Sequence, residues 1–451
     1  MKKTIFACLV SGLLALPAIA QVNEIKIVGN GQIAMAVPDF RGAGGAQNYM
    51  TAFNSTLFSE LQNSGQFRMV PKTMMPLQIP QQPMDLKPAP SPTTKGNGNY
   101  LSDWSSPPAN ANYLAFGYTA EKDGQFVLYG WLYDVTRQDM TSAQIIGKVY
   151  FGPLSDDGAK KVARDFAADI LAIFGGKGLV GSKIYFVSDR TGHKEIWFMD
   201  YDGSNQKEFT RYGSITTFPI ISPDGTKLAF LTYARGIPDI FIHSLETGRK
   251  LPFYNPRASM NAPSDFMPDS QHLLLYSSAG GGYSQIYIAD LDGGNLKRIS
   301  NSRSSDVEAK VNPKTGADLV FVSGRSGMPQ IYAMSIDGIN VRRLTDGVGE
   351  AVNPAWSPDG KHIAFAWTRG YEPGNYNIFI MDVATREFTQ LTHGAGRNEN
   401  PVWAPDGVHL VYSSKRGRAT EIFTMRADGT GQQQLTTVGD NMKPVWSKAS
   451  N

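Results

Sequence analysis

Cysteine is almost absent from this sequence of 451 residues, and the only one is Cys8. It falls inside residues 1–20, which begin with two lysines, continue with an apolar run over 5–16 and end with a small-x-small pattern at 18–20. This is the pattern of a secretory signal peptide, and we predict cleavage before Gln21. The mature chain then has no disulfide and no cysteine chemistry.

A large excess of one charge and a second long apolar run are also missing. The formal net charge is +3, and it becomes 3 − 2 = +1 once Lys2 and Lys3 leave with the signal. So small an excess gives no support for a nucleic-acid partner. No later run of about 18 apolar residues is present. We therefore expect an exported, soluble chain that does not insert into a membrane.

The usual motifs of catalytic and metal sites are missing as well. There is no G-x-S-x-G nucleophile elbow and no H-E-x-x-H zinc motif. The aspartates of 200–203 and 290–293 lack the further carboxylates of a calcium loop and indicate hairpin turns. His272, His362 and His409 occupy one repeated position just after a turn, where we expect them to be solvated or hydrogen-bonded. The sequence therefore predicts no catalytic residue, no metal site and no cofactor.

Residues 21–178 have the mixed pattern of a small α/β domain. Ser155 and Asp156 stand where they can cap the second of its helices. A segment rich in Pro, Gln and Ser, 71–108, shows no core pattern, and we predict a long exposed loop there. Helices are expected over 46–61 and 157–174, and strands over 33–37, 113–118, 125–135 and 144–151.

A repeat begins after Gly181, so residues 179–451 are predicted to form a second domain. Each copy contains an S-P-D-G-like turn between two apolar strands, then an I-Y or I-F strand and a short strand ending in L-T. The prolines of the turn are spaced by 45, 45, 45 and 47 residues, which is the length of one four-stranded propeller blade. These prolines are Pro223, Pro268, Pro313, Pro358 and Pro405.

The strands predict six blades and the way in which the ring closes. The second and third strands of a blade each occur six times, whereas no first strand precedes Ile184. An extra first strand stands at the end of the chain, in KPVWS over 443–447. Because a ring of blades leaves two unpaired edges, we predict that this strand completes the first blade. The expected fold is an α/β N-terminal domain followed by an all-β six-bladed propeller closed by its C-terminal strand.

Polar loops at one end of the propeller channel are the candidate binding surface. The loops that lead into the first strands converge there with the loops between second and third strands, which carry several arginines. Both signs of charge on one rim suit a protein partner better than a polyanion, although an ordinary solvated rim has the same composition. The polar positions of the first set are Ser259, Asn261, Asp306, Glu308, Glu350, Asn353, Arg397, Asn398 and Glu399.

Several phrases of the sequence are specific enough to compare with a known family. The second domain repeats P-x-W-S-P-D-G, I-A-F and I-Y-x-M-x-x-D-G, and the first contains IAMAVPDF at 33–40, WLYDV at 131–135 and VARDFAADI at 162–170. This combination resembles the TolB family of periplasmic propellers of the Tol-Pal system, over nearly all of the mature chain. Two features depart from the family pattern: the segment 71–108 is longer, and Arg164 stands where a histidine is expected.

The resemblance implies a monomeric, non-enzymatic adaptor in the periplasm of a Gram-negative bacterium, which supports outer-membrane integrity and envelope constriction in cell division. Such proteins bind the lipoprotein Pal across the channel mouth and the inner-membrane protein TolA through the segment after the signal, and the two events are linked. The residues expected to contact Pal are Asn261, Ala262, Asp306, Glu308, Glu350, Asn353, Arg397 and Asn398. Those expected to bind TolA are Gln21, Val22, Asn23, Glu24, Ile25, Lys26 and Ile27.

Two other functions are left open by the residues alone. An exported propeller hydrolase needs a nucleophile with base partners, which the sequence does not display. A glycan-binding propeller needs aromatic residues around the channel mouth, whereas Trp356, Trp403 and Trp446 are predicted to lie inside strands.

Overall fold

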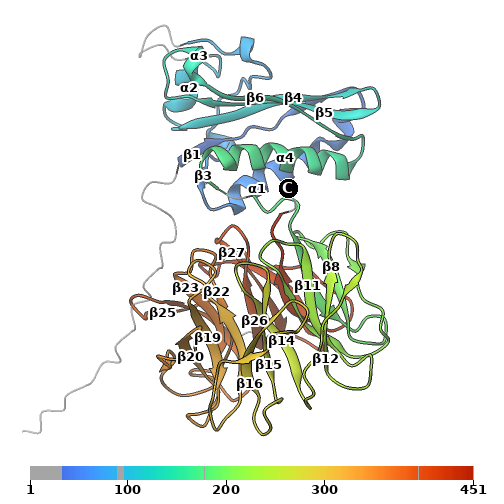
Figure 1. Cartoon of the computed structure of the whole chain (residues 1–451). Helices are drawn as coiled ribbons and strands as arrows, with labels where there is room; N and C mark the ends of the chain where they lie inside the picture. The colour runs from blue at the N-terminus through green and yellow to red at the C-terminus, as the bar shows by residue number, and fades with distance from the viewer. Residues whose placement is uncertain (1–32, 89–95, 177, 395, 450–451) are drawn as a thin grey trace, which may run out of the picture.

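The computed structural model describes residues 33–88, 96–176, 178–394 and 396–449. The predicted signal, 1–20, and the segment expected to bind TolA, 21–27, lie outside the described residues. An α/β domain occupies one end of the molecule, and a ring of six antiparallel sheets forms the other (Figure 1). The predicted fold class is therefore confirmed.

The sheet of the α/β domain has six strands in the order β3-β1-β4-β5-β6, with β2 beside β4. β1 pairs in parallel with β3 and β4, whereas β4, β5 and β6 form an antiparallel meander. The strands are β1 (Ile33–Ala36), β2 (Arg41–Ala43), β3 (Phe67–Met69), β4 (Tyr113–Lys122), β5 (Gln125–Asp134) and β6 (Gln144–Pro153).

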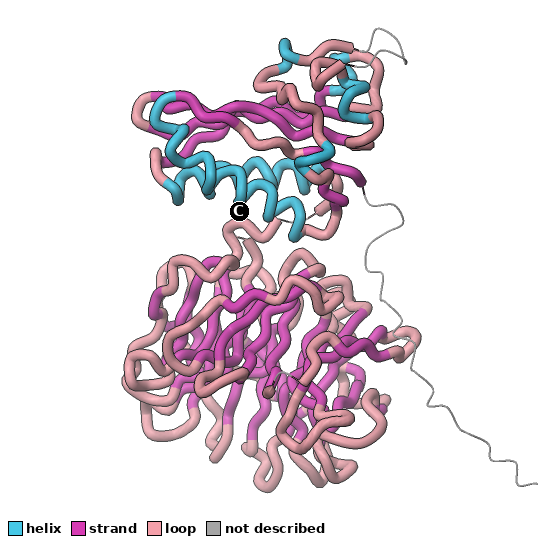
Figure 2. Tube along the Cα trace, turned by 180° about the vertical axis from the view of Figure 1, so that it is seen from behind, coloured by secondary structure: helices cyan, strands magenta, loops and turns pink. Residues whose placement is uncertain are grey.

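Two long helices cover the inner face of this sheet. α1 (Met50–Asn63) follows the 3-10 helix η1 (Gly44–Tyr49) and buries an apolar residue at every third or fourth position. α4 (Asp156–Ile173) is capped as predicted, because the N–H of Gly158 donates to Ser155 Oγ at 3.1 Å. Both helices lie between the sheet and the propeller in Figures 1 and 2. Among the described residues, no helix has the length and apolar character needed to cross a bilayer.

The segment 71–108 is not the exposed, coreless loop that we predicted. Leu86, Leu101 and Trp104 are at most 4% exposed and pack on the outer face of the sheet, opposite α1 and α4. They form a second core with residues of β4 and β5. The short elements on this side of the sheet are η2 (Lys72–Met74), η3 (Pro83–Asp85), α2 (Leu101–Ser105) and α3 (Met140–Ala143).

This prediction failed because the apolar residues of the segment are widely spaced and follow no helix or strand period. Backbone N–H groups of this segment donate to carboxylate side chains instead of to the backbone carbonyls of a helix or strand. Asp103 accepts hydrogen bonds from the N–H groups of Gly96, Gly98 and Tyr100 at 2.7 to 3.0 Å. Trp104 has a hydrogen bond of its own, because its Nε1 donates to the carbonyl of Gly98 at 3.1 Å. An irregular chain can thus bury a core when its polar backbone groups are satisfied.

The second domain consists of six four-stranded antiparallel sheets, here called blades 1 to 6. The first strand of each blade lies against the first strands of its neighbours, so these six strands line the channel. The blades are, in order from the channel outwards, β30 (Asn441–Trp446), β7 (Lys183–Ser188), β8 (Glu195–Asp200), β9 (Lys207–Glu208); β10 (Thr216–Ile221), β11 (Lys227–Thr232), β12 (Asp239–Ser244), β13 (Lys250–Leu251); β14 (Asn261–Phe266), β15 (His272–Ser277), β16 (Gln285–Asp290), β17 (Lys297–Arg298); β18 (Asp306–Val311), β19 (Asp318–Ser323), β20 (Gln330–Ser335), β21 (Arg342–Arg343); β22 (Ala351–Trp356), β23 (His362–Trp367), β24 (Asn377–Asp382), β25 (Phe388–Gln390); and β26 (Arg397–Trp403), β27 (His409–Lys415), β28 (Glu421–Arg426), β29 (Gln433–Gln434).

The C-terminal strand closes the ring as predicted. β30 pairs antiparallel with β7, with Trp446 opposite Ile184. The N–H of Lys183 donates to Ser447 Oγ at 2.9 Å, and Trp446 Nε1 donates to Ser182 Oγ at 3.0 Å. Blade 1 is therefore assembled from both ends of the propeller sequence.

The turns between first and second strands also have the predicted chemistry. In blade 5 the N–H of Gly360 donates to the carbonyl of Ser357 at 2.9 Å, and Gly360 has a φ of +69°. The three histidines that follow these turns each lie beside an aspartate, and the side chains of His272 and His409 are hydrogen-bonded to it. His409, for example, contacts the carboxylate of Asp406 through Nδ1 at 2.6 Å.

Candidate partner-binding site

The two ends of the propeller channel differ in what covers them. Asp406 and His409, from the turn of blade 6, line one cavity together with residues of α1. The α/β domain therefore lies over the end that carries these turns, which we call the covered end. The loops that lead into the first strands are at the opposite end, which we call the distal end, and Figure 1 shows it turned away from the α/β domain. We predicted the channel mouth at the distal end.

A β-bulge in the first strand of every blade shapes the channel wall. In five blades one residue at this bulge has a φ of 51° to 55°, which is uncommon for residues other than glycine. Blade 3 has a proline at this position, and the ring of proline fixes φ at a negative value. We call these six residues the channel ring. From blade 1 to blade 6 they are Lys443, Phe218, Pro263, Glu308, Asn353 and Asn400.

The channel ring and its neighbours enclose a cavity of about 90 Å³. A water molecule occupies about 30 Å³ of the liquid, so this space accommodates about three waters or one small side chain. The wall is mostly apolar, with charged groups at only three positions. The apolar lining includes Phe218, Pro219, Pro263, Tyr276, Pro354, Pro401 and Pro444, and the charged residues are Glu308, Lys310 and Lys443.

Hydrogen bonds link members of the channel ring across neighbouring blades. The Glu308 carboxylate accepts from the N–H of Asn353 at 2.9 Å and from its Nδ2 at 3.1 Å. Asn353 Oδ1 in turn accepts from the N–H of Asn400 at 3.3 Å. Blades 4, 5 and 6 are thus joined at the channel wall, and the Glu308 carboxylate is engaged within the protein.

Lys443 lies in the same ring without such a partner. Its Nζ is 4.0 Å from the centroid of the Phe218 ring, a cation–π distance. Burial lowers the pKa of Lys443, although the nearby charges of Glu308 and Glu399 oppose the shift. Glu308 is engaged as described, and Glu399 forms an ion pair with Arg397. In the part of the chain that the structure describes, no carboxylate forms an ion pair with the Lys443 ammonium group.

Four of the eight residues that we expected to contact Pal are buried inside their blades. Asn261, Ala262, Asp306 and Asn398 are at most 2% exposed. Ser277 of β15 donates to Asn261 at 2.6 Å, an equivalent bond recurs at Asn398, and Asp306 accepts from an arginine at 2.8 Å. These side chains hold the first strand of a blade against the second and present no surface to a partner. We therefore withdraw them as contact residues.

The other four predicted residues, Glu308, Glu350, Asn353 and Arg397, lie at the channel or on its rim. Glu308 and Asn353 line the cavity. Glu350 accepts a hydrogen bond from the hydroxyl of Tyr376, and the exposed Arg397 guanidinium lies 5.5 Å from the centroid of the Tyr376 ring. Burial and the bond to Glu350 raise the pKa of Tyr376. Glu350, Tyr376 and Arg397 thus form a polar group beside the channel, here called the rim cluster.

Five arginines of the loops between second and third strands stack on their own blades. In five blades the guanidinium carbon lies 4.2 to 5.4 Å from the centroid of an aromatic ring. Cation–π contacts of this kind fix the position of the charge, so these arginines are part of the blade architecture. The pairs are Arg190 with Trp197, Arg235 with Phe241, Arg325 with Tyr332, Arg369 with Trp367 and Arg416 with Phe423.

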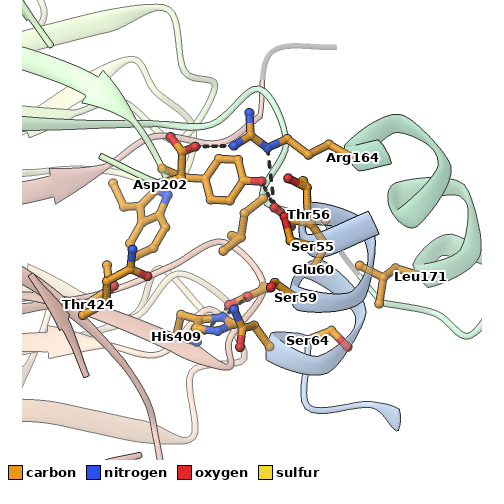
Figure 3. A pocket seen from close by; sticks show the side chains of 17 residues that line it. Ser55, Thr56, Ser59, Glu60, Ser64, Arg164, Leu171, Asp202, His409 and Thr424 are labelled. Carbon is orange, nitrogen blue, oxygen red and sulfur yellow. Dashed lines mark hydrogen bonds and ion pairs between the residues drawn. The ribbon is translucent and has the colours of Figure 1, made fainter. Parts of the chain in front are cut away.

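A second cavity, of about 310 Å³, lies at the covered end between α1, α4 and blades 1 and 6 (Figure 3). Arg164 of α4 forms an ion pair with Asp202 of the β8–β9 turn, and its Nε is 3.5 Å from the carboxylate of Glu60 in α1. The hydroxyl of Tyr201 donates to Glu60, and the Arg164 guanidinium lies 5.4 Å from the Tyr201 ring. Burial raises the pKa of Glu60, and the bonds from Tyr201 and Arg164 offset this only in part. We call these four residues the inter-domain cluster.

Reasoning from the sequence missed Phe218, Asn400 and Lys443 as channel residues. A signal for them exists, because each precedes the proline of its first strand, as Asn353 does in the phrase N-P-A-W. No comparable signal identifies the inter-domain cluster. Its members come from α1, α4 and a turn of blade 1, and only the placement of the two domains brings them together.

The fold and the cavities define a protein of two domains, an α/β domain and a propeller. The α/β domain covers one end of the propeller channel, and the other end is turned away from it. Two family models match this chain: a TolB amino-terminal domain over residues 23–141 and a TolB beta propeller domain over residues 171–449. The second match covers more than half of the chain. The chain therefore belongs to the TolB family.

Individual relatives agree with this assignment. A protein TolB homolog of Chlorobium luteolum is 29% identical over 382 residues, 84% of this chain and 71% of the relative. The Tol-Pal system protein TolB of Bordetella pertussis is 28% identical over 309 residues, 68% of this chain and 64% of the relative. With a TolB homolog of Chlorobaculum tepidum, 30% identical over 257 residues, the match spans about half of each chain, 54%. The crystal structure of TolB from Acinetobacter baumannii shares the fold, with a TM-score of 0.70, 24% identity and coverage of 93% of this chain and 98% of that one.

Proposed function

We propose that this protein is a non-enzymatic adaptor of the Tol-Pal system in the periplasm of a Gram-negative bacterium. In this proposal it binds the lipoprotein Pal at the distal end of the channel and TolA through residues 21–27, and so supports outer-membrane integrity and envelope constriction in cell division. The observation that carries the proposal is the distal channel end, where a small cavity and the rim cluster lie together, away from the α/β domain.

Two further points support an adaptor. The B. pertussis relative is named as a Tol-Pal system protein. At the distal end Glu308, Glu350 and Arg397 are engaged in ion pairs and hydrogen bonds that fix a surface, which suits recognition of a protein.

Calorimetric titration of the protein with the soluble domain of Pal tests the first part of the proposal. We expect binding that weakens at least tenfold in Arg397→Glu, because the substitution reverses a charge of the rim cluster. Arg249→Glu is the matched control, since Arg249 is an exposed arginine in an outer turn of blade 2, and it is expected to bind like the unchanged protein. Absence of binding by the unchanged protein refutes the proposal, and equal weakening by both variants refutes the assignment of the distal end.

Removal of residues 21–27 tests the second part. We expect the shortened protein to lose binding to TolA and to keep its binding site for Pal. Linkage of the two events predicts that saturating Pal changes the affinity for TolA, and that TolA changes the affinity for Pal by the same factor. Loss of Pal binding with TolA binding intact contradicts these roles.

A further inference from the structure

Lys443 is a charged group for which the described part of the chain supplies no ion-pair partner, although Glu308 and Glu399 lie near enough to act on its pKa. We propose that the channel cavity receives one carboxylate side chain, an aspartate or glutamate of the protein partner, and that this carboxylate pairs with the Lys443 ammonium group. The inference rests on the proposed function only in that the partner reaches the channel from the distal end.

The first argument is the environment of the ammonium group. A buried charge is costly to keep unless it is paired and hydrogen-bonded. Lys443 has a cation–π contact to Phe218 at 4.0 Å. The two carboxylates that influence its pKa, Glu308 and Glu399, are bonded to other groups. Lys310, the other lysine of the cavity, differs because its Nζ donates to the carbonyl of Ser264. Lys443 is therefore the cation that an incoming anion can pair with.

The second argument is the size and charge of the cavity. A volume of about 90 Å³ is enough for one small side chain. Its proline-rich wall offers few groups to hydrate an ion, so a charge that enters depends on Lys443. Glu308 in the same wall repels an anion with two charges, such as phosphate, more strongly than an anion with one charge. A singly charged carboxylate meets these conditions.

The third argument decides between a free acid and a side chain of a protein. The rim cluster lies close to the cavity, because Arg397 and its ion-pair partner Glu399 both influence the pKa of Lys443. Arg397 is exposed, and Glu350 accepts a hydrogen bond from Tyr376. These groups can bind the backbone or side chains on either side of an inserted residue. A small free acid makes no use of them, whereas a polypeptide contacts the cavity and the rim together.

Selection of peptides from a random display library tests the inference without using Pal. The library is panned on the unchanged protein, on Lys443→Met and on Lys361→Met, which changes an exposed lysine in a turn of the covered end. We expect Asp or Glu to be enriched at one position on the unchanged protein and on Lys361→Met, and not on Lys443→Met. Melting curves check that Lys443→Met is folded. Absence of acidic enrichment, or equal enrichment on all three proteins, overturns the inference. Displacement of the selected peptide by inorganic phosphate but not by acetate overturns the choice of a carboxylate.

Double-mutant cycles with the soluble domain of Pal give the second test. We expect Lys443→Met to weaken binding at least tenfold, and one carboxylate of Pal, changed to its amide, to make binding insensitive to that substitution. Additive effects for every carboxylate overturn the pairing. If the unchanged protein fails to bind Pal, the proposed function is refuted, and the peptide selection still decides whether the cavity takes a carboxylate.

Discussion

Arg164 and Lys443 are both partly buried cations, one at the covered end of the propeller and one in the channel. Arg164 meets two carboxylates, Glu60 and Asp202, from another helix and from the propeller. Lys443 meets an aromatic ring and no carboxylate among the described residues. The difference indicates what each end is built for. A charge whose partners belong to the same chain forms a permanent joint, whereas a charge left without a partner favours a ligand that brings one.

The residue types fit this contrast. The guanidinium of arginine is a planar group with five donors and bridges two acceptors at once, as Arg164 does between α1 and blade 1. The ammonium of lysine is a compact charge on a flexible stem and accommodates a partner that arrives from solution. The departure from the family pattern at Arg164, where a histidine was expected, therefore concerns the covered end and leaves the channel cavity as it is.

The largest expected effect comes from a change that removes the framework of both ends. Ending the chain after Met442 deletes most of β30, including Trp446, which is 8% exposed. Loss of a buried tryptophan alone costs about 3–5 kcal/mol, and the open ring also loses its pairing with β7. We expect the melting temperature to fall by more than about 10 °C in calorimetry. Ending the chain after Lys448 keeps Ser447 and is the control, and an unchanged melting temperature in the shorter protein contradicts closure by β30.

A smaller effect, confined to the covered end, is expected for Arg164→Ala. The substitution leaves Glu60 and Asp202 facing each other without a cation, and we expect a loss of about 2–3 kcal/mol in the free energy of unfolding. Affinity for Pal is expected to stay within about twofold, because the channel ring is unchanged. Lys161→Ala, which removes an exposed pair on the same helix, is the control and should cost less than about 0.5 kcal/mol. A large change in the affinity of Arg164→Ala for Pal contradicts the view that the covered end and the channel act independently.

A slightly smaller loss of stability is expected for a substitution in the channel ring, at Asn353. This residue has a φ of +54° and bonds to Glu308. In Asn353→Ala we expect a loss of about 2 kcal/mol, from the lost side-chain hydrogen bonds and because alanine tolerates a left-handed backbone less well than asparagine does. Asn353→Gly loses the same bonds without that strain, so it should be about 1 kcal/mol less destabilised in urea unfolding. Equal losses for both variants contradict a left-handed backbone at this bulge.

The smallest effect is expected for a carboxylate that, unlike the Lys443 ammonium group, has partners within the chain. Burial opposes ionisation of Asp224, but hydrogen bonds from Ser222 and Thr226 lower its pKa to about 2. The ordinary pKa is 3.8, so the stabilising contribution is complete above pH 3.8 and is lost as the pH falls through 2. Because the side chain is 37% exposed, screening reduces the contribution to about 1 kcal/mol. The difference in unfolding free energy between the protein and Asp224→Asn, measured from pH 5 to about pH 2, should shrink by that amount; a constant difference contradicts the assignment.

The repeat made the propeller predictable, whereas contacts between distant segments were not. Six copies of the second strand and an orphan PVWS phrase define the ring and its closure, because spacing and strand period are local properties of the sequence. The polar residues at the starts of first strands were misread as rim residues. Asn261 and Asp306 turn inwards to hydrogen-bond neighbouring elements, and polarity in a sequence does not distinguish a solvated group from a buried, paired one. The core of 71–108 was missed for a related reason, since Trp104 lies in a segment without any period.

Closure by the last strand also means that blade 1 stays incomplete until synthesis of the chain is nearly finished. Lys183 and Ser447, hydrogen-bonded in the finished ring, are 264 residues apart in the chain. At a synthesis rate of about 5–20 residues per second, β7 is made roughly 13 to 50 seconds before its partner β30 exists. During that interval the edge of β7 is unpaired, and edges of this kind recruit other strands. Blade 1 is therefore the earliest blade to be synthesised and the last to be completed, and the hazard of misassembly falls on the nascent chain rather than on the folded protein.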